Sequence, residues 1–293
     1  MWQAVLRRRM RVPIVLALAL GVGSGALAAG DPGSGSDSRR MEERLWPRIA
    51  YPSQRAVRSA QRFAAGWGDV SFAVIGRSSD LRGYQVTRTY SSASASKVLL
   101  LAAQLRALQR DKDPLDSGTR ALLEPMIIYS DNDAAGGIYA RVGDAGLEDV
   151  AERAGMRDFS VDPGFWGGAQ ITAADMARFY FRLERNLGHR YRDYGMRLLS
   201  SIAPTQRWGI PAAAGRSWRV WFKGGWRPGG QEGTTGPVTH QAALLAHRDG
   251  ERLAIAVLSN ETPGTGGGFD AIEGVTARLL AKAPPRRGGW VVP

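Results

Sequence analysis

The chain has 293 residues, a formal net charge of +12 and no cysteine. The lack of cysteine excludes disulfide bonds, thiolate metal sites and cysteine nucleophiles. The positive charge favours anionic partners such as cell-wall polymers or membrane surfaces, although it is equally consistent with general solubility. The length is sufficient for one sizeable core or for two closely joined lobes.

Residues 1–28 have the pattern of a secretory signal peptide. Four arginines near the N-terminus precede an apolar stretch at 12–27, which ends in the small-residue sequence Ala26-Leu27-Ala28. A proline and several glycines interrupt the stretch and argue against a permanent membrane span, but an uncleaved anchor stays an alternative. We therefore expect an exported protein, secreted or associated with the cell envelope, in which residues 29–45 form a flexible linker.

Hydrophobic periodicity and capping residues predict a mixture of helices and strands behind this linker. In chain order we expect a helix at 53–65, strands at 71–75 and 84–87, a helix at 94–109, helices at 120–129, 134–142, 147–154 and 173–187, strands at 219–222, 238–245 and 253–258, and a helix at 270–280. Strands near both ends with helices between them predict an α+β fold, with one antiparallel sheet built from both termini plus a helical lobe. We expect one domain at 46–283 and a disordered tail at 284–293.

A Ser-x-x-Lys motif, Ser94-Ala95-Ser96-Lys97, opens an apolar helical stretch. Residues three apart lie on the same face of a helix, so the Ser94 hydroxyl and the Lys97 amine can meet. A serine beside an amine that can release its proton is an activated nucleophile. The N–H groups and the positive dipole end at a helix N-terminus also suit a developing oxyanion.

Lysine usage sets Lys97 and Lys223 apart. The chain has only four lysines, and all its other basic residues apart from three histidines are arginines. A guanidinium stays protonated, whereas burial or a neighbouring cation allows an ammonium group to lose its proton. We interpret Lys97 and Lys223 as positions where arginine could not perform the function, with coincidence as the alternative.

Two further motifs follow in the order that a Ser/Lys acyltransferase needs. Ser130-Asp131-Asn132 falls at a break between two predicted helices, where Ser130 can relay a proton and Asn132 can bind a substrate amide. The alternative is an ordinary helix N-cap, because all three residue types are favoured there. Lys223-Gly224-Gly225 is expected to end an apolar strand, where the glycines admit a substrate backbone and Lys223 attracts a carboxylate. The alternative is a glycine-rich turn.

Two other patterns are open to more than one interpretation. Four tryptophans surround the Lys223 strand and either line an apolar substrate groove or pack in the core: Trp208, Trp218, Trp221 and Trp226. The glycine-rich segment 264–268 precedes a predicted helix, but no Lys-Ser/Thr pair follows it, so we expect a loop there and not a phosphate-binding site.

The ordered set Ser-x-x-Lys, Ser-Asp-Asn and Lys-x-Gly resembles the motifs of the class A β-lactamase and penicillin-binding protein family of serine hydrolases. Segments 129–135, 171–177 and 207–211 are also similar to segments of that family. The resemblance covers nearly all of the chain after the leader. It implies an α+β fold of the β-lactamase/transpeptidase type.

The resemblance also implies a role for each matching residue. Ser94 would be the acylated nucleophile, Lys97 its base and Ser130 the proton relay. The backbone N–H groups of Ser94 and Trp226 would form the oxyanion hole. The residues implied in substrate binding are Asn132, Lys223, Gly225 and Trp226.

The sequence departs from the family pattern in three places. Gly224 replaces the hydroxyl residue of the Lys-Thr/Ser-Gly motif, and the stretch from Ser94 to Ser130 is short. Loop 161–170 contains neither the Glu that activates the hydrolytic water in class A β-lactamases nor the Asn that follows it. Asp162 is the only carboxylate of this loop and therefore its only candidate for deacylation. We expect acylation to be retained and deacylation to be slow.

These observations predict an exported serine hydrolase that forms an acyl-enzyme on Ser94 with a β-lactam or a related amide or ester. The alternatives are a D-alanyl-D-alanine carboxypeptidase-like enzyme and a non-catalytic cell-wall-binding protein that keeps the fold. The expected partner is a small-molecule β-lactam or a peptidoglycan-type peptide, with anionic cell-wall polymers as a further candidate. We expect no cofactor, no metal and no nucleic acid, and the oligomeric state is left open.

Overall fold

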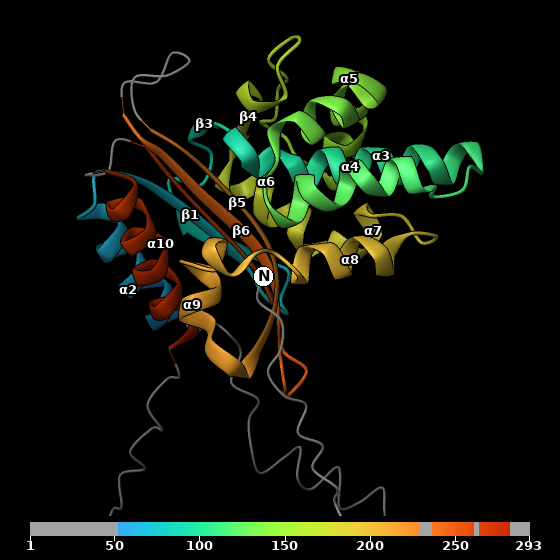
Figure 1. Cartoon of the computed structure of the whole chain (residues 1–293). Coiled ribbons are helices and arrows are strands. Elements are labelled where there is room, and N and C mark those ends of the chain that lie inside the picture. Colours follow the sequence, from blue (N-terminus) through green and yellow to red (C-terminus); the bar gives the residue numbers. More distant parts are fainter. Residues whose placement is uncertain (1–51, 229–235, 261–263, 282–293) are drawn as a thin grey trace, which may run out of the picture. The chain divides into compact units, whose positions relative to one another are not determined.

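A computed structural model describes residues 52–228, 236–260 and 264–281 of the chain. The leader predicted at 1–28, the linker predicted at 29–45 and the tail predicted at 284–293 lie outside the described residues. The described residues form an α+β fold, in which helices cover an antiparallel sheet (Figure 1). The predicted fold class is therefore confirmed.

The main sheet has five antiparallel strands in the order β2-β1-β7-β6-β5. Its strands are β1 (Asp69–Ile75), β2 (Leu81–Tyr84), β5 (Trp218–Arg227), β6 (Val238–His247) and β7 (Arg252–Asn260). The pairing of β1 with β7 joins the two ends of the domain, as the sequence predicts. The central strand β7 is buried from Leu253 to Ser259, because it is covered on both faces and is mostly apolar over this length.

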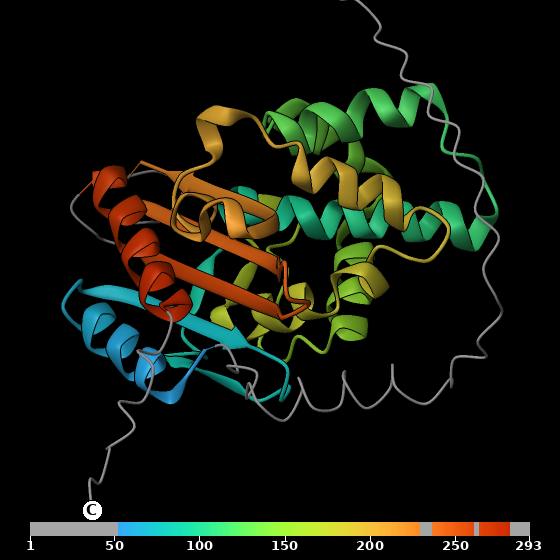
Figure 2. The same cartoon turned by 90° about the horizontal axis from the view of Figure 1, so that it is seen from below.

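Helices pack on both faces of this sheet (Figures 1 and 2). On one face, α2 (Gln54–Ala65) and α10 (Gly264–Leu280) lie side by side, and α10 also contacts α9 (Ile210–Ala214). On the other face, α6 (Ala173–Phe181) packs against β1 and β7 and connects the sheet with the helical lobe. The lobe consists of α3 (Lys97–Asp111), α4 (Ser117–Ile128), α5 (Asn132–Ala154), α7 (Leu183–Asn186) and α8 (Arg192–Ser200).

Short segments connect these layers around the site described below. A two-stranded sheet pairs β3 (Thr89–Ser91) with β4 (Gln170–Thr172). The 3-10 turn η1 (Ala93–Ser96) follows β3 and leads directly into α3, and a second 3-10 turn, η2 (Trp166–Gly168), contacts η1. The pairing of β3 with β4 therefore brings the start of α3 next to the loop that precedes β4. Two more 3-10 turns are η3 (Pro204–Gln206) and η4 (Gly215–Ser217).

Capping side chains set the starts of three helices. The Ser53 hydroxyl accepts the Ala56 N–H at 3.1 Å and begins α2. The Thr172 hydroxyl accepts the Asp175 N–H at 3.1 Å, which is the predicted start of α6. The Asp131 carboxylate accepts the Ala134 N–H at 2.7 Å and begins α5. Each cap satisfies an N–H group that has no partner within its helix.

The structure differs from the predicted elements in several places. The helices predicted at 134–142 and 147–154 are joined in α5, which has a non-helical residue at Gly143, and β3, β4, α8 and α9 were not predicted. Strand β2 covers 81–84 and not 84–87. Strand β5 continues to Arg227, so Lys223-Gly224-Gly225 lies inside the strand and does not end it; β6 pairs with every residue of β5 and holds the glycines extended. The glycine-rich segment 264–268, predicted as a loop, begins α10. The helix predicted at 173–187 is interrupted at Arg182, which separates α6 from α7.

Within the described part of the chain, no helix combines the length and the apolar character that a bilayer span requires.

Candidate active site

Ser94 lies at the junction of the sheet and the helical lobe, in turn η1 immediately before α3. It lines a cavity of about 360 Å³ together with Asn132 of α5 and Trp226 of β5. The predicted Ser-x-x-Lys motif therefore spans a 3-10 turn and the first residue of α3. The other residues that line the cavity are Ala93, Phe165, Trp166, Gly167, Arg227 and Pro228.

Lys97 is the first residue of α3, and its side chain is fully buried. Its Nζ donates to the Ser130 carbonyl oxygen at 2.5 Å, to Asn132 Oδ1 at 2.7 Å and to Ser130 Oγ at 3.3 Å. No hydrogen bond among the described residues joins Nζ to the Ser94 hydroxyl. The amine is thus held by the segment between α4 and α5, one helical turn from the candidate nucleophile.

Ser130 bridges the two buried lysines. Lys223 is also fully buried, and its Nζ donates to Ser130 Oγ and to the Gly224 carbonyl oxygen, both at 2.9 Å. Ser130 has a φ of 63°, a left-handed conformation that is rare for a residue with a side chain. Such strained residues gather at functional sites, which supports a role for Ser130 beyond capping. The N-cap of α5 is its neighbour, Asp131.

Burial shifts the proton equilibria of both amines. It lowers the pKa of Lys97 from 10.5 to about 8, and the Asp131 carboxylate opposes this shift. Burial also lowers the pKa of Lys223 well below its ordinary value, and the positive charge of Lys97 adds to the effect. Two ammonium groups that share the Ser130 hydroxyl repel each other, so the site favours a state in which one amine is neutral.

Gly225 brings β5 into contact with the turn that carries Ser94. A Cβ atom at this position would lie 2.5 Å from the Ala95 nitrogen and 2.9 Å from the Ser94 nitrogen, both of which are backbone atoms. Only glycine permits this approach. The contact places the Ser94 N–H beside β5, where the next residue of the strand is Trp226.

Gly224 lies under an aromatic ring. A Cβ atom here would be 3.1 Å and 3.2 Å from two ring carbons of Trp208, which stacks on Phe269 with ring centroids 4.1 Å apart. Trp208 also meets Trp226 edge to face. The ring of Trp208 therefore lies in contact with the position where the resemblance implies a hydroxyl residue.

Loop 161–170 places Trp166 over the Lys97 amine. Lys97 Nζ lies 4.9 Å from the centre of the Trp166 ring, within the range of a cation–π contact. Asp162 lies against Gly168 of the same loop, since a Cβ atom there would be only 2.8 Å from the Asp162 Cβ. Asp162 is exposed and is not among the described residues that line the Ser94 cavity.

A buried histidine holds the segment that precedes Ser94. His240 pairs with Gly225 across β6 and β5, and its Nε2 lies 3.0 Å from the Ser91 carbonyl oxygen, while its Nδ1 accepts the Ser259 N–H at 3.3 Å. These contacts require a neutral ring with the proton on Nε2. Burial agrees, because it lowers the pKa of His240 to about 4. His240 therefore anchors the segment before Ser94 as a neutral residue.

The structure thus brings together seven of the eight predicted site residues: Ser94, Lys97, Ser130, Asn132, Lys223, Gly225 and Trp226. Asp162 lies apart from them. Sequence reasoning did not single out Trp166, Arg227 or His240. Its only signal for Trp166 was the aromatic pair Phe165-Trp166 in a loop that lacks the expected Glu. Among the described residues, no cluster of His, Asp and Glu could hold a metal ion.

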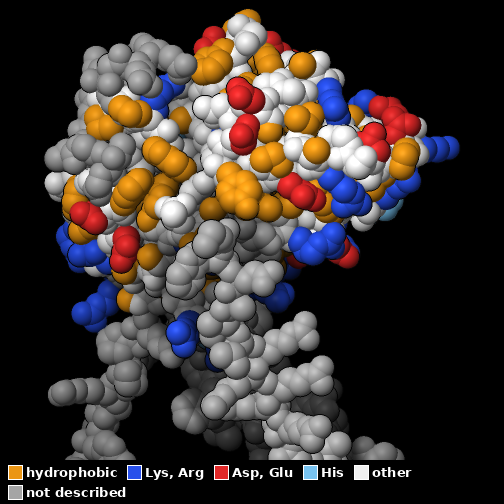
Figure 3. All heavy atoms as spheres, in the orientation of Figure 1, with side chains coloured by type: hydrophobic (Ala, Val, Ile, Leu, Met, Phe, Trp, Pro, Cys, Tyr) orange, Lys and Arg blue, Asp and Glu red, His pale blue; other side chains and the backbone are white. Residues whose placement is uncertain are grey.

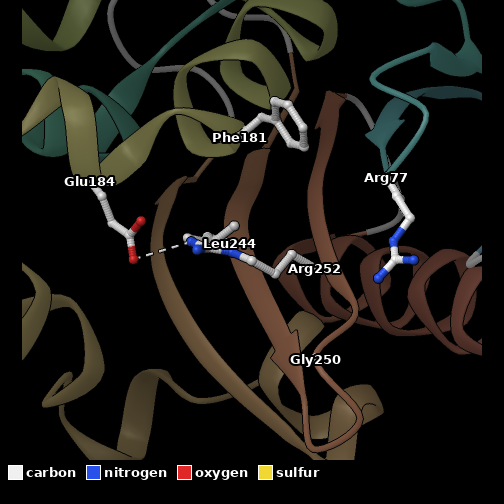
Figure 4. Close-up of a pocket in the computed structure, with 6 residues that line it drawn as sticks. All are labelled: Arg77, Phe181, Glu184, Leu244, Gly250 and Arg252. Atoms are coloured by element: carbon white, nitrogen blue, oxygen red, sulfur yellow. Dashed lines mark ion pairs between the residues drawn. The ribbon is translucent and has the colours of Figure 1, made fainter. Parts of the chain in front are cut away.

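A second pocket, shown in Figure 4, lies away from Ser94. It has a volume of about 340 Å³ and is lined by Arg77, Phe181, Glu184, Leu244, Gly250 and Arg252. Its charges neutralise one another or a neighbour, because Arg252 pairs with Glu184 at 3.2 Å and Arg77 pairs with Glu251 at 3.7 Å. Nothing in this pocket resembles a catalytic arrangement.

Comparison with known proteins identifies a matching family. Residues 111–282 match the model of the beta-lactamase enzyme family, a range that includes Ser130–Asn132 and Lys223–Gly225 and begins after Lys97. No curated protein matches the sequence.

Among solved structures, the chain is similar to the beta-lactamase from Sphaerobacter thermophilus DSM 20745, with 20% identity, a TM-score of 0.66, and coverage of 78% of this chain and 97% of that one. It is similar to PBP-A with 17% identity, a TM-score of 0.66, and coverage of 78% and 95%. An ancestral class A beta-lactamase (GNCA) gives 20% identity, a TM-score of 0.66, and coverage of 77% and 98%. These likenesses show a shared fold. Together with the family match, they establish that the chain belongs to the beta-lactamase enzyme family.

Proposed function

We propose that this protein is an exported serine hydrolase that forms a long-lived acyl-enzyme on Ser94 with a β-lactam or a related amide or ester. One observation carries the proposal. Two fully buried lysines, Lys97 and Lys223, converge on Ser130 beside the cavity that Ser94 lines. Buried amines with lowered pKa values are suited to moving protons, and such groups gather at functional sites.

In the proposed acylation, neutral Lys97 accepts the proton of Ser94 while Oγ attacks the substrate carbonyl carbon. The N–H groups of Ser94 and Trp226 stabilise the oxyanion. When the tetrahedral intermediate collapses, the C–N bond breaks and Ser130 donates its proton to the leaving nitrogen. A neighbouring lysine ammonium returns a proton to Ser130, so the proton taken from Ser94 is matched by the proton given to the leaving nitrogen. The positive charge of the lysines attracts an anionic group of the substrate.

Slow deacylation follows from the loop opposite Ser94. Hydrolysis of an acyl-enzyme needs a base that activates a water molecule. Loop 161–170 offers Trp166 over Lys97, and its one carboxylate, Asp162, lies against Gly168. An indole ring over the amine excludes water and provides no base. We therefore propose that acylation is complete and that turnover is limited by deacylation.

The adduct is the direct test of this function. Incubation with benzylpenicillin is expected to add the whole mass of the probe, because ring opening releases no fragment, and peptide mapping should place it on Ser94. The adduct is expected to persist for hours, and Asp162→Ala is expected to leave its rate of loss unchanged. Lack of an adduct in the wild type, or an equal adduct in Ser94→Ala, would contradict the proposal. Release of D-alanine from a D-alanyl-D-alanine peptide would favour the carboxypeptidase-like alternative.

The pH dependence of acylation tests Lys97 as the base. Only the neutral amine can accept the proton, so the rate is expected to rise with pH and to reach its midpoint near pH 8. The Asp131 carboxylate raises the pKa of Lys97, so Asp131→Asn is expected to lower the midpoint and to acylate faster than the wild type below pH 8. Asparagine is also a good N-cap, so α5 should stay intact.

Asp133→Asn is the matched control, since Asp133 lies exposed in the first turn of the same helix. It is expected to leave the midpoint in place. A midpoint in Asp131→Asn that equals or exceeds the wild-type value, measured by the rate of mass gain over pH 6 to 10, would exclude Lys97 as the group that titrates.

A further inference from the structure

A groove rich in arginine runs beside the first half of β5, apart from the Ser94 cavity. It has a volume of about 650 Å³, and we name it the arginine groove after Arg207, Arg216, Arg219 and Arg248. Strand β5 is the last strand of the sheet, so the groove lies at the edge of the sheet. Arg219 precedes Gly225 by six residues on this strand, a separation of roughly 20 Å.

The four arginines are exposed and have no acidic partner among the described residues. No carboxylate of the described residues forms an ion pair with any of them. Two of them are held by carbonyl oxygens: Arg248 donates to Arg216 at 3.2 Å and Arg207 to Ser200 at 3.4 Å. Asp249 lies beside the groove but contacts His247 at 2.8 Å. Four positive charges in one concavity create a field that attracts anions.

Many other basic residues of the described chain lie beside acidic ones. In the pocket of Figure 4, both arginines form ion pairs. Over the helical lobe, on the right of Figure 3, basic side chains lie among acidic ones. Arg153 with Asp149 at 2.9 Å is one such pair. Helix α2 also carries exposed arginines that form no ion pair with a described carboxylate, Arg55, Arg58 and Arg62, but these lie along one helix. The groove differs because its arginines surround a single concavity.

The aromatic side chains of the groove indicate which anion it fits. Binding of single-stranded nucleic acid relies on exposed aromatic faces on which bases stack. Here Trp218 is buried, with its ring 4.7 Å from that of His247, and the Arg219 guanidinium lies 5.7 Å from the Trp221 ring. The groove thus presents charge, while one indole is buried and the other lies beside a guanidinium, which suits a phosphate backbone that carries no bases.

We propose that the arginine groove binds an anionic polymer of phosphodiester-linked polyols or sugars, the kind of chain found in cell envelopes. The inference that the polymer comes from the cell envelope rests on the export proposed above. The inference that the groove binds an anion rests on its charge and does not depend on export. A polymer held there would leave the Ser94 cavity open. It would also keep the enzyme at the surface where its substrates occur and raise their effective concentration.

Binding of a soluble, labelled poly(glycerol phosphate) chain, followed by fluorescence anisotropy at several salt concentrations, tests the proposal. The triple variant Arg216→Gln, Arg219→Gln, Arg248→Gln is expected to bind at least about tenfold more weakly at low salt, with the slope of log K against log salt reduced by about two. The matched control is Arg55→Gln, Arg58→Gln, Arg62→Gln on α2, which packs on β1 and β2 at the opposite edge of the sheet. It removes the same charge and is expected to change binding less than about threefold.

Equal losses in the two triple variants would overturn the proposal, because the effect would then be one of net charge. Tighter binding of single-stranded DNA of matched length and charge would overturn the choice of polymer. Ser94→Ala is expected to bind the polymer like the wild type, so loss of acylation and loss of polymer binding are separate outcomes. Thermal unfolding reports on folding, and if the triple variant unfolds, Arg219→Gln alone is expected to weaken binding by about two- to threefold.

Discussion

Replacing Lys97 by methionine is expected to slow the acylation of Ser94 by benzylpenicillin about a thousandfold, the usual range for loss of a general base. Methionine has a similar length and suits the fully buried site, but it cannot accept a proton. The mass gain over time gives the rate. The substitution also leaves the Ser130 carbonyl oxygen and Asn132 Oδ1 without their donor, which is expected to lower the free energy of unfolding by about 1–3 kcal/mol.

Lys112→Met is the matched control for this prediction. Lys112 follows the last residue of α3 and is exposed, so the same change of side chain should leave the acylation rate unaltered. Denaturant titration separates a folding defect from a chemical one. An acylation rate in Lys97→Met within tenfold of the wild type would show that another group accepts the Ser94 proton, and Lys223 would then be the next lysine to replace.

Gly225→Ala is expected to destabilise the protein by about 2–3 kcal/mol and to abolish most acylation. The added Cβ would meet the nitrogens of Ala95 and Ser94 at 2.5 and 2.9 Å and the Ser92 carbonyl oxygen at 3.0 Å. All three are backbone atoms, so no side-chain rotation relieves the contact. Either β5 or η1 must move, and both carry groups of the proposed oxyanion hole.

Gly136→Ala provides the comparison for this substitution. Gly136 lies in α5, and a Cβ there has nothing within 4 Å, so alanine is expected to be neutral or to stabilise the helix by up to about 1 kcal/mol. Chemical denaturation and the rate of benzylpenicillin acylation measure both variants. If Gly225→Ala matched Gly136→Ala in both measurements, the close packing of β5 against the Ser94 turn would be wrong.

The layout of the fold could be predicted because its strands and helices carry strong local patterns. The apolar strands near both ends of the domain indicated a sheet built from both termini, and the helix predicted to begin at 173 begins there as α6. The continuation of β5 through Lys223-Gly224-Gly225 could not be predicted. Glycines weaken a strand on their own, and only the pairing with β6 along the whole of β5 keeps them extended.

The candidate site, like the fold, could be predicted only in part from the sequence. The order of Ser94, Ser130 and Lys223 along the chain was enough to propose a common site. The contacts that define its chemistry depend on three dimensions: Ser130 between two buried amines, Gly225 against the Ser94 turn and Trp166 over Lys97. A sequence cannot show that a loop tryptophan from residue 166 covers an amine at residue 97.

The ring of Trp208 over Gly224 also constrains the history of this protein. A threonine or serine at residue 224 would place its Cβ about 3 Å from that ring, so the ring or the strand would have to shift by a few tenths of an ångström to admit the hydroxyl of the family motif. A smaller side chain at residue 208 would remove this cost. The two positions are therefore expected to have evolved as a coupled pair.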